Sequence, residues 1–156
     1  MDAISRLHLT HLSVNLECIT EPPSGLRKSF SNVTHLDLLG IYPPDLEILI
    51  HFTSLTHLAL SNGMDRAASL SLFSRIPKLQ MVLHLRSSGI TSSLSVVEDF
   101  NPDVDDPRII ELVCGFESGV RDWLDDVEDG RGLWQLASGA VVARMKVKAV
   151  RCGNSI

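Results

Sequence analysis

One pattern of apolar and polar positions occurs three times near the N-terminus and dominates the sequence. It reads Leu/Val-Thr-His-Leu-x-Leu/Val, and its copies begin at residues 9, 33 and 55, with a degenerate fourth copy beginning at residue 79. The copies therefore start 24, 22 and 24 residues apart. A unit of this size cannot bury its apolar face alone, so the pattern predicts repeated units that stack on one another.

Within each copy, the residues alternate between the two faces of a predicted β-strand. The apolar residues point to one face, which we expect to form the core. The side chains between them point to the opposite face, where parallel strands about 4.8 Å apart would stack them in rows. We predict that these rows are exposed and form the concave binding face of a solenoid. The predicted binding residues are His11, Ser13, His35, Asp37, His57 and Ala59.

The period of the pattern predicts the fold class. Its length lies within the roughly 20–29 residues of a leucine-rich repeat, so we expect an α/β fold that is a short, irregular leucine-rich-repeat solenoid. It should have about five parallel strands, with every return segment on one side and a C-terminal helical cap. The strands are expected, in this spatial order, near residues 9–14, 33–38, 55–60, 79–85 and 108–114.

The return segments carry their own apolar signals. Phe30, Phe52 and Ile76 each lie three residues before a repeat position and are expected to anchor the preceding return to the core. A helix is predicted over residues 46–50, with Leu46, Leu49 and Ile50 on its inner face, and another over residues 65–75, with Leu70 and Phe73 inward.

Beyond residue 86 the pattern loosens, and the segment reads as the end of the solenoid. A short helix is predicted over residues 93–100, and the run Ile109–Val113 predicts a buried parallel strand. Helical stretches over residues 120–127 and 133–141 would cap the last core layer, as atypical terminal repeats do. We therefore expect one domain over residues 1–156, with repeats over about 4–86 and the fifth strand and cap over about 87–150.

Charge is uneven along the chain. Residues 98–129 carry twelve acids and two bases, whereas residues 131–156 carry five bases and no acid. We expect the basic tail to pair with the acidic segment or to be solvated. The repeats have no dominant basic face, so no nucleic acid partner is expected. No apolar run is long enough for a membrane span, and the start lacks a secretory signal. Three dispersed cysteines fit a reduced compartment, so an intracellular protein, cytoplasmic or nuclear, is expected.

Candidate chemistry is sparse. His11, His35 and His57 carry imidazoles that could bind Zn²⁺, but side chains stacked in a row point in parallel and do not converge on a tetrahedral centre. The acidic run over residues 99–105 lacks the glycine and the bidentate glutamate of a calcium loop. Cys114 lies in an apolar strand, which favours an inert thiol. We therefore expect no catalytic residue, no metal, no cofactor and no enzymatic activity.

Longer motifs carry a family resemblance. Phe-x-x-(Val/Leu)-Thr-His-Leu-x-Leu occurs at residues 30–38 and 52–60, and Asp106-Pro107-Arg108-Ile109-Ile110 is followed by segments containing Trp123 and Trp134. Over roughly residues 4–146, the chain resembles the leucine-rich-repeat region of F-box-like proteins of mushroom-forming fungi. The resemblance implies a substrate receptor of cullin–RING ubiquitin ligases, in which the repeats hold the substrate and an F-box docks on the ligase adaptor. The F-box itself has no counterpart here, because the first strand is expected at about residue 9.

The expected function is therefore a protein–protein interaction module with an unidentified protein partner. The alternative is a truncated or remnant solenoid fragment with no independent activity. The first strand would lack a capping repeat, and an uncovered strand edge is a template for pairing with another chain. We accordingly expect self-association through the N-terminal strand.

Overall fold

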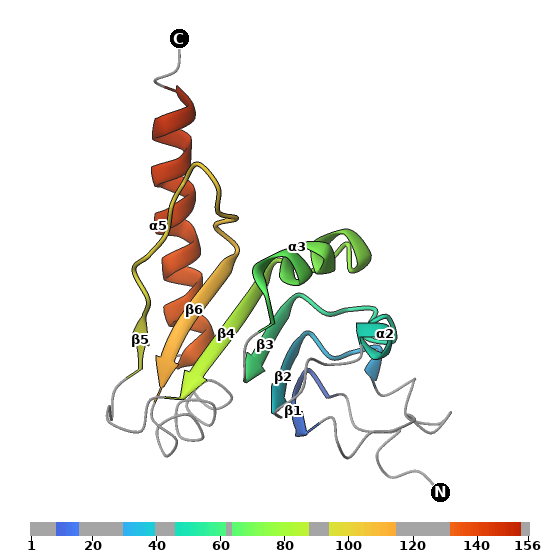
Figure 1. Ribbon diagram of the computed structural model, residues 1–156. Coiled ribbons are helices and arrows are strands. Elements are labelled where there is room, and N and C mark those ends of the chain that lie inside the picture. The colour runs from blue at the N-terminus through green and yellow to red at the C-terminus, as the bar shows by residue number, and fades with distance from the viewer. Residues whose placement is uncertain are drawn as a thin grey trace, which may run out of the picture. The chain divides into compact units, whose positions relative to one another are not determined.

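The chain has an α/β architecture with a mostly parallel sheet and a C-terminal helix (Figure 1). The computed structural model describes residues 9–15, 30–39, 46–61, 64–87, 94–114 and 132–153. The strands in these ranges are β1 (His11–Asn15), β2 (His35–Leu39), β3 (His57–Ser61), β4 (Met81–Ser87), β5 (Ser95–Val96) and β6 (Ile109–Cys114). The helices are α2 (Leu46–Leu49), α3 (Arg66–Arg75) and α5 (Leu133–Gly153).

The strand order is β1-β2-β3-β4-β6-β5. The chain forms two compact units, Met1–Val82 and Leu83–Ile156, with the boundary inside β4. The sequence predicted a single domain, with the change from repeats to cap near residue 86. Each unit is described below by itself.

The five predicted strands are present at their expected places and in their expected order, as β1, β2, β3, β4 and β6. β1 pairs with β2 and β2 with β3 in parallel, with each repeat aligned on the next. One backbone arrangement recurs at the strand starts. The Thr10 carbonyl accepts from the amides of Thr34 and His35, at 2.8 and 3.0 Å. The Thr34 carbonyl accepts in the same way from Thr56 and His57, at 2.9 and 3.0 Å.

The leucine face of β2 and β3 forms the core of the first unit. Leu36 and Leu58 have no exposed surface, and the rings of Phe30 and Phe52 stack with centroids 4.8 Å apart. These aromatic residues confirm the predicted anchors, since each lies in the same place in its own repeat. On the outermost strand, Leu12 is only partly buried, although it packs against the same cluster. The apolar face of the repeats is thus the one that the sequence predicted.

Helices α2 and α3 pack on the leucine face, so these returns lie on one side of the strands (Figure 1). Asp65 caps α3, because its carboxylate accepts a hydrogen bond from the Ala68 amide at 2.8 Å. Two inward assignments are wrong. Leu70 is 42% exposed, and Ile50 is 49% exposed and lies after the end of α2.

The inner face of α3 is instead the stripe Ser69, Leu72, Phe73 and Ile76, which has the i, i+3, i+4, i+7 spacing of one helix face. Ser69 is fully buried because its hydroxyl donates to the Asp65 carbonyl at 3.1 Å. The sequence reading chose the larger residue Leu70, but the hydrogen bond within the helix makes the small polar residue the better neighbour for the core.

The second unit departs from the prediction at its edge. The expected helix over residues 93–100 is absent, and β5 pairs antiparallel with β6 through Ser95 opposite Val113 and Val96 opposite Leu112. The hydrogen bonding to β6 continues just beyond β5, where the Val97 amide donates to the Glu111 carbonyl at 2.9 Å. β-Branched residues at 96 and 97 favour this extended path over a helix.

Helix α5 packs on β5 and β6. It begins where the second capping helix was predicted and runs for 21 residues, well beyond the predicted end. Leu133, Trp134 and Ala137 are buried on its inner side, so Trp134 belongs to the core of this unit. The helix predicted over residues 120–127 and its Trp123 lie outside the described residues. No helix in the ranges described is both long and apolar enough to cross a membrane.

Candidate functional site

Three histidines form a stacked column on the strand face opposite the leucine core. The ring centroids of His11 and His35 are 4.2 Å apart with planes inclined by 13°, and those of His35 and His57 are 4.2 Å apart and inclined by 9°. The repeat produces this geometry, because equivalent residues of adjacent parallel strands lie side by side. The predicted row is confirmed, but its side chains are half-buried, where the sequence prediction had them exposed.

The threonine before each histidine holds the ring in place. Thr34 Oγ1 donates to the Thr10 carbonyl at 3.1 Å and lies 2.9 Å from His35 Nδ1. Thr56 Oγ1 donates to the Thr34 carbonyl at 3.0 Å and lies 2.7 Å from His57 Nδ1. A hydroxyl has a single proton, so each of these oxygens must accept a hydrogen bond from the ring nitrogen. The neutral rings of His35 and His57 therefore carry their proton on Nδ1, and Nε2 is the acceptor nitrogen.

Two rings of the column, those of His35 and His57, resist protonation. Burial lowers the pKa of His35 to about 3, with further lowering by the neighbouring imidazoles of His57 and His11. Burial likewise lowers the pKa of His57, with a smaller contribution from His11. Charged imidazolium rings stacked at this distance would repel one another, and half-burial removes the water that would stabilise them. His35 and His57 thus present neutral, flat, hydrogen-bonding side chains at neutral pH.

The second row of predicted binding residues runs beside the column. Ser13 lies opposite Asp37, and Asp37 lies opposite Ala59. The prediction that this row is exposed is wrong for two of its members, since Asp37 is 7% exposed and Ala59 has no exposed surface. The Ser13 hydroxyl donates to Asp37 Oδ2 at 3.2 Å. Burial raises the pKa of Asp37 to about 6, and the hydrogen bond from Ser13 opposes that change.

The other candidate groups have structural roles in the described residues. Asp105 is buried, and its Oδ2 accepts from the Asn101 amide at 2.6 Å, so the acidic run folds as a turn. Cys114 is buried, and its Sγ lies 3.8 Å from the Arg86 carbonyl. Across the described ranges, no group of three His, Cys, Asp or Glu side chains is arranged to hold a metal ion.

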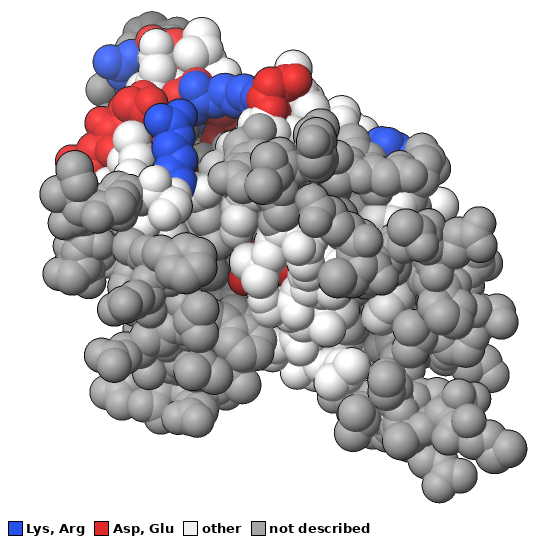
Figure 2. All heavy atoms as spheres, turned by 60° about the horizontal axis from the view of Figure 1, so that its bottom comes forward, with Lys and Arg blue, Asp and Glu red and all other residues white. Residues whose placement is uncertain are grey.

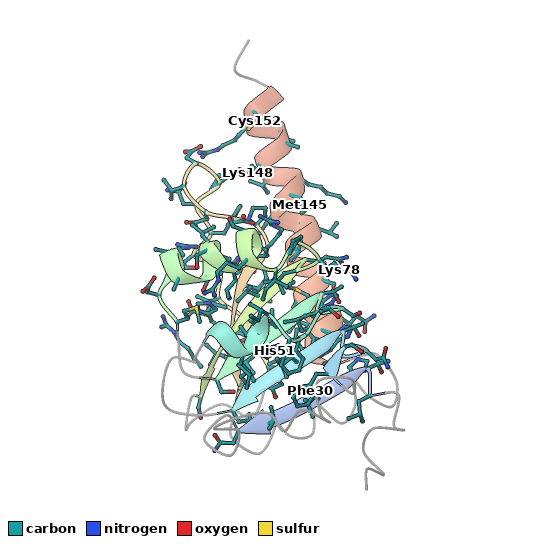
Figure 3. The ribbon with its side chains drawn as sticks, turned by 90° about the vertical axis from the view of Figure 1, so that its right-hand side faces the viewer. Phe30, His51, Lys78, Met145, Lys148 and Cys152 are labelled. Carbon is teal, nitrogen blue, oxygen red and sulfur yellow. The ribbon has the colours of Figure 1, made fainter. Side chains whose placement is uncertain are left out.

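The acidic segment and the basic tail contact each other in the second unit. The sequence analysis expected the tail either to pair in this way or to be solvated. Arg151 Nη1 lies 2.6 Å from Asp103 Oδ2. Lys148 reaches from α5 to the loop over residues 101–108, where its Nζ donates to the Asp105 carbonyl at 3.0 Å (Figure 3). On the face shown in Figure 2, Lys and Arg side chains lie among Asp and Glu side chains in one region, which matches mutual pairing.

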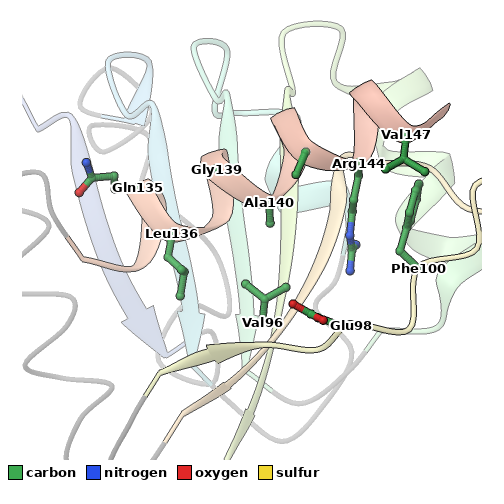
Figure 4. A pocket seen from close by; sticks show the side chains of 10 residues that line it. Val96, Glu98, Phe100, Gln135, Leu136, Gly139, Ala140, Arg144 and Val147 are labelled. Carbon is green, nitrogen blue, oxygen red and sulfur yellow. The ribbon is translucent and has the colours of Figure 1, made fainter. Parts of the chain in front are cut away.

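Sequence reasoning missed a groove in the second unit, between α5 and the segment over residues 96–100 (Figure 4). Its volume is about 710 Å³. Arg144 forms part of its wall and is 8% exposed, with Nη1 donating to the Ile109 carbonyl at 2.7 Å and Nη2 to the Val97 carbonyl at 2.9 Å. Its guanidinium also lies 4.9 Å from the centre of the Phe100 ring. A lone arginine in a helical segment gives no sequence signal for this position. The remaining lining residues are Val96, Glu98, Gln135, Leu136, Gly139, Ala140, Ala143 and Val147.

No protein-family model, curated protein or solved structure matches this chain. The functional argument therefore depends on the arrangement of its own residues.

Proposed function

We propose that this chain is a protein–protein interaction module: a leucine-rich-repeat solenoid that contacts its partner through the strand face of β1, β2 and β3. The observation that carries the proposal is the stacked column of His11, His35 and His57. A protein that needed only a core would gain nothing from an ordered polar column on the face opposite its leucines. Ordered, half-buried rings lose little conformational freedom when a partner covers them, which favours binding.

The column and its neighbours support binding and offer no set of groups for catalysis. The Thr34 and Thr56 hydroxyls fix the rings, so the partner would meet a preorganised surface. The resemblance noted above extends the proposal to substrate recognition of the kind attributed to F-box-type ubiquitin-ligase receptors, inside the cell. No metal, cofactor, nucleic acid or membrane has a part in it.

The test is a selection of binders from a displayed library of random peptides, followed by affinity measurements on one variant. In that variant His11, His35 and His57 are all replaced by phenylalanine, which keeps stacked rings but removes every ring nitrogen. We expect selected peptides to bind this variant at least about tenfold more weakly than the original chain, the loss typical of an interface hot spot.

A matched control carries three substitutions on the return segments, Thr53→Ala, Ser74→Ala and Lys78→Ala, all at exposed positions (Figure 3 shows Lys78). It should bind as the original chain does, and circular dichroism should show both variants folded. Equal binding by the phenylalanine variant would contradict the proposed surface. A selection that yields no binder would favour the alternative of an inert solenoid fragment.

A further inference from the structure

One carbonyl-binding arrangement recurs where the strands of the first unit begin. The Thr10 carbonyl accepts from the Thr34 amide at 2.8 Å, from the His35 amide at 3.0 Å and from the Thr34 hydroxyl at 3.1 Å. The Thr34 carbonyl accepts the equivalent three hydrogen bonds from Thr56 and His57, at 2.9, 3.0 and 3.0 Å. Each Thr-His pair is therefore a three-donor site that holds a backbone carbonyl of the preceding strand.

The first repeat has the same donors in Thr10 and His11. Its hydroxyl lies 3.1 Å from His11 Nδ1, much as the Thr34 hydroxyl lies 2.9 Å from the ring of the next residue. β1 is the end of the strand order, and among the described residues no carbonyl is hydrogen-bonded to the Thr10 amide (Figure 1). Thr10 is exposed, so this donor set lies at an open edge of the sheet.

The histidine column ends at the same edge. His11 stacks on His35 with one face of its ring, at a centroid distance of 4.2 Å. Because the column follows the order of the strands, the other face of the His11 ring is directed to the outer side of β1. A further parallel strand would lie about 4.8 Å away and would place a side chain over that ring face.

We propose that the edge of β1 binds an extended segment of the protein partner, which runs parallel to β1, places one backbone carbonyl at the donors of Thr10 and His11, and stacks a flat side chain on His11. The inference rests on the proposed function, because the segment extends the same strand face by one row. In binding of this kind, main-chain hydrogen bonds give affinity and alternate side chains give specificity.

The register of the repeats specifies the segment. The residue after the one that supplies the carbonyl lies next to His11, so we expect His, Phe, Tyr or Trp there. The following residue lies next to Leu12, and the residue two positions further lies next to Val14. Both should be aliphatic, because Leu12 and Val14 are only partly buried and pack against the leucine cluster. The segment thus reads flat, aliphatic, any residue, aliphatic.

A second copy of this chain fits the donor site less well. Two copies that pair through β1 would be related by a two-fold axis, which makes the two strands antiparallel. The filled sites of β2 and β3 hold the carbonyl of a parallel neighbour. A partner segment bound at this edge would also prevent β1 from pairing with another copy there.

The first test uses peptides selected on the full chain from the displayed library. Their sequences should share the flat, aliphatic, any residue, aliphatic pattern. In a parallel strand alternate amides face the neighbour, so the amide of the residue after the flat one should donate to β1. N-methylation there should weaken binding at least about tenfold. N-methylation of the flat residue itself, whose amide points away, is the matched control and should change binding less than about threefold.

The second test removes one donor from the protein. Thr10→Val keeps the branched side chain and loses the hydroxyl, so peptide binding should weaken about fivefold. Thr10→Ser keeps a hydroxyl and should bind within about twofold of the original chain. The Thr10 hydroxyl contacts the His11 ring and no described carbonyl, so neither variant should move the midpoint of urea denaturation.

The direction of the segment is measured with a nitroxide on the N-terminal end of the peptide. In the parallel arrangement it should broaden the amide signal of Leu9 more than that of Ser13. The opposite order would show an antiparallel strand and would refute the carbonyl site.

The remaining outcomes separate this inference from the proposed function. Peptides that need the histidine column but tolerate N-methylation at both positions would refute strand addition and leave the proposed function standing. Equal binding to Thr10→Val and Thr10→Ser would refute the part of the hydroxyl. A library that yields no binder would refute both proposals together.

Discussion

Asp37 makes the folded state sensitive to pH in a direction unusual for an aspartate. Its pKa rises from 3.8 to about 6 on folding, because burial disfavours the charged form. At a pH of about 3 or below the carboxyl group is largely protonated in both states, so folding carries almost no penalty there. As the pH rises to about 6 and beyond, the folded state must ionise a buried group, and stability falls by about 3 kcal/mol.

Asp37→Asn should remove this loss. We expect the free energy of unfolding of the variant, relative to the original chain, to increase by about 3 kcal/mol between a pH of about 3 and one of about 7. Urea denaturation at several pH values measures the difference. The histidines of the column are present in both proteins, so their titration cancels. A difference that stayed constant with pH would show that Asp37 ionises in the folded state as easily as in the unfolded chain.

The sequence predicted which residues of the candidate site lie side by side, but it did not predict how deeply each is buried. The repeat of period 24, 22 and 24 residues fixed which side chains lie beside one another, and the aligned rows of β1, β2 and β3 confirm it. The sequence could not predict that Asp37 and Ala59 are buried. Strand alternation assigns a side chain to a face, whereas burial depends on the segments that pack over that face.

At the level of secondary structure elements, Arg144 links α5 to the two strands that it covers. Its buried guanidinium donates to the Ile109 carbonyl in β6 and to the Val97 carbonyl directly after β5. Replacement by methionine keeps the apolar length of the side chain but removes two charge-assisted hydrogen bonds. We expect a loss of about 3 kcal/mol in the stability of the second unit.

Lys146 is the matched control, because Lys146→Met makes the same change of charge at an exposed position of the same helix. Its effect on urea denaturation should be within about 0.5 kcal/mol. Amide exchange in β6 should become faster in Arg144→Met and stay unchanged in Lys146→Met. If Arg144→Met and Lys146→Met lowered stability by equally small amounts, Arg144 would not be the residue that holds α5 against β5 and β6.

The elements themselves were predictable wherever the sequence repeats. All five expected strands are present. Four of them, β1 to β4, carry the repeat pattern, whereas β6 was predicted from its apolar run over residues 109–113. β5 was missed, since a strand of two residues is too short to show a period. It exists because Val97 and its neighbours bond to β6, a tertiary contact that no local pattern contains. The inner face of α3 was misassigned for a different reason. The Ser69 hydroxyl donates to the Asp65 carbonyl at the start of the helix, so this polar side chain could be buried in place of Leu70.

At the scale of the molecule, β1 is the end of the strand order and pairs with β2. The Thr10 carbonyl points towards β2, where it accepts from Thr34 and His35. Because backbone groups alternate along a parallel strand, the amides and carbonyls of His11 and Ser13 point to the other side. An outer edge of this kind is a template for pairing with a strand of another chain.

We therefore expect the chain to self-associate through β1, and the structure identifies the substitution that tests it. A lysine at Ser13 would be a natural block for an edge, but the Ser13 hydroxyl donates to Asp37, so that change would disturb the strand face as well. Ser13→Lys is therefore compared with Ser13→Ala, because both variants lose that hydrogen bond and only the lysine places a charge at the strand edge. Sedimentation velocity at increasing protein concentration should show less association for Ser13→Lys than for Ser13→Ala. A monomer at every concentration, with slow amide exchange at Ser13 in the original chain, would show that this edge is already covered and would refute the prediction.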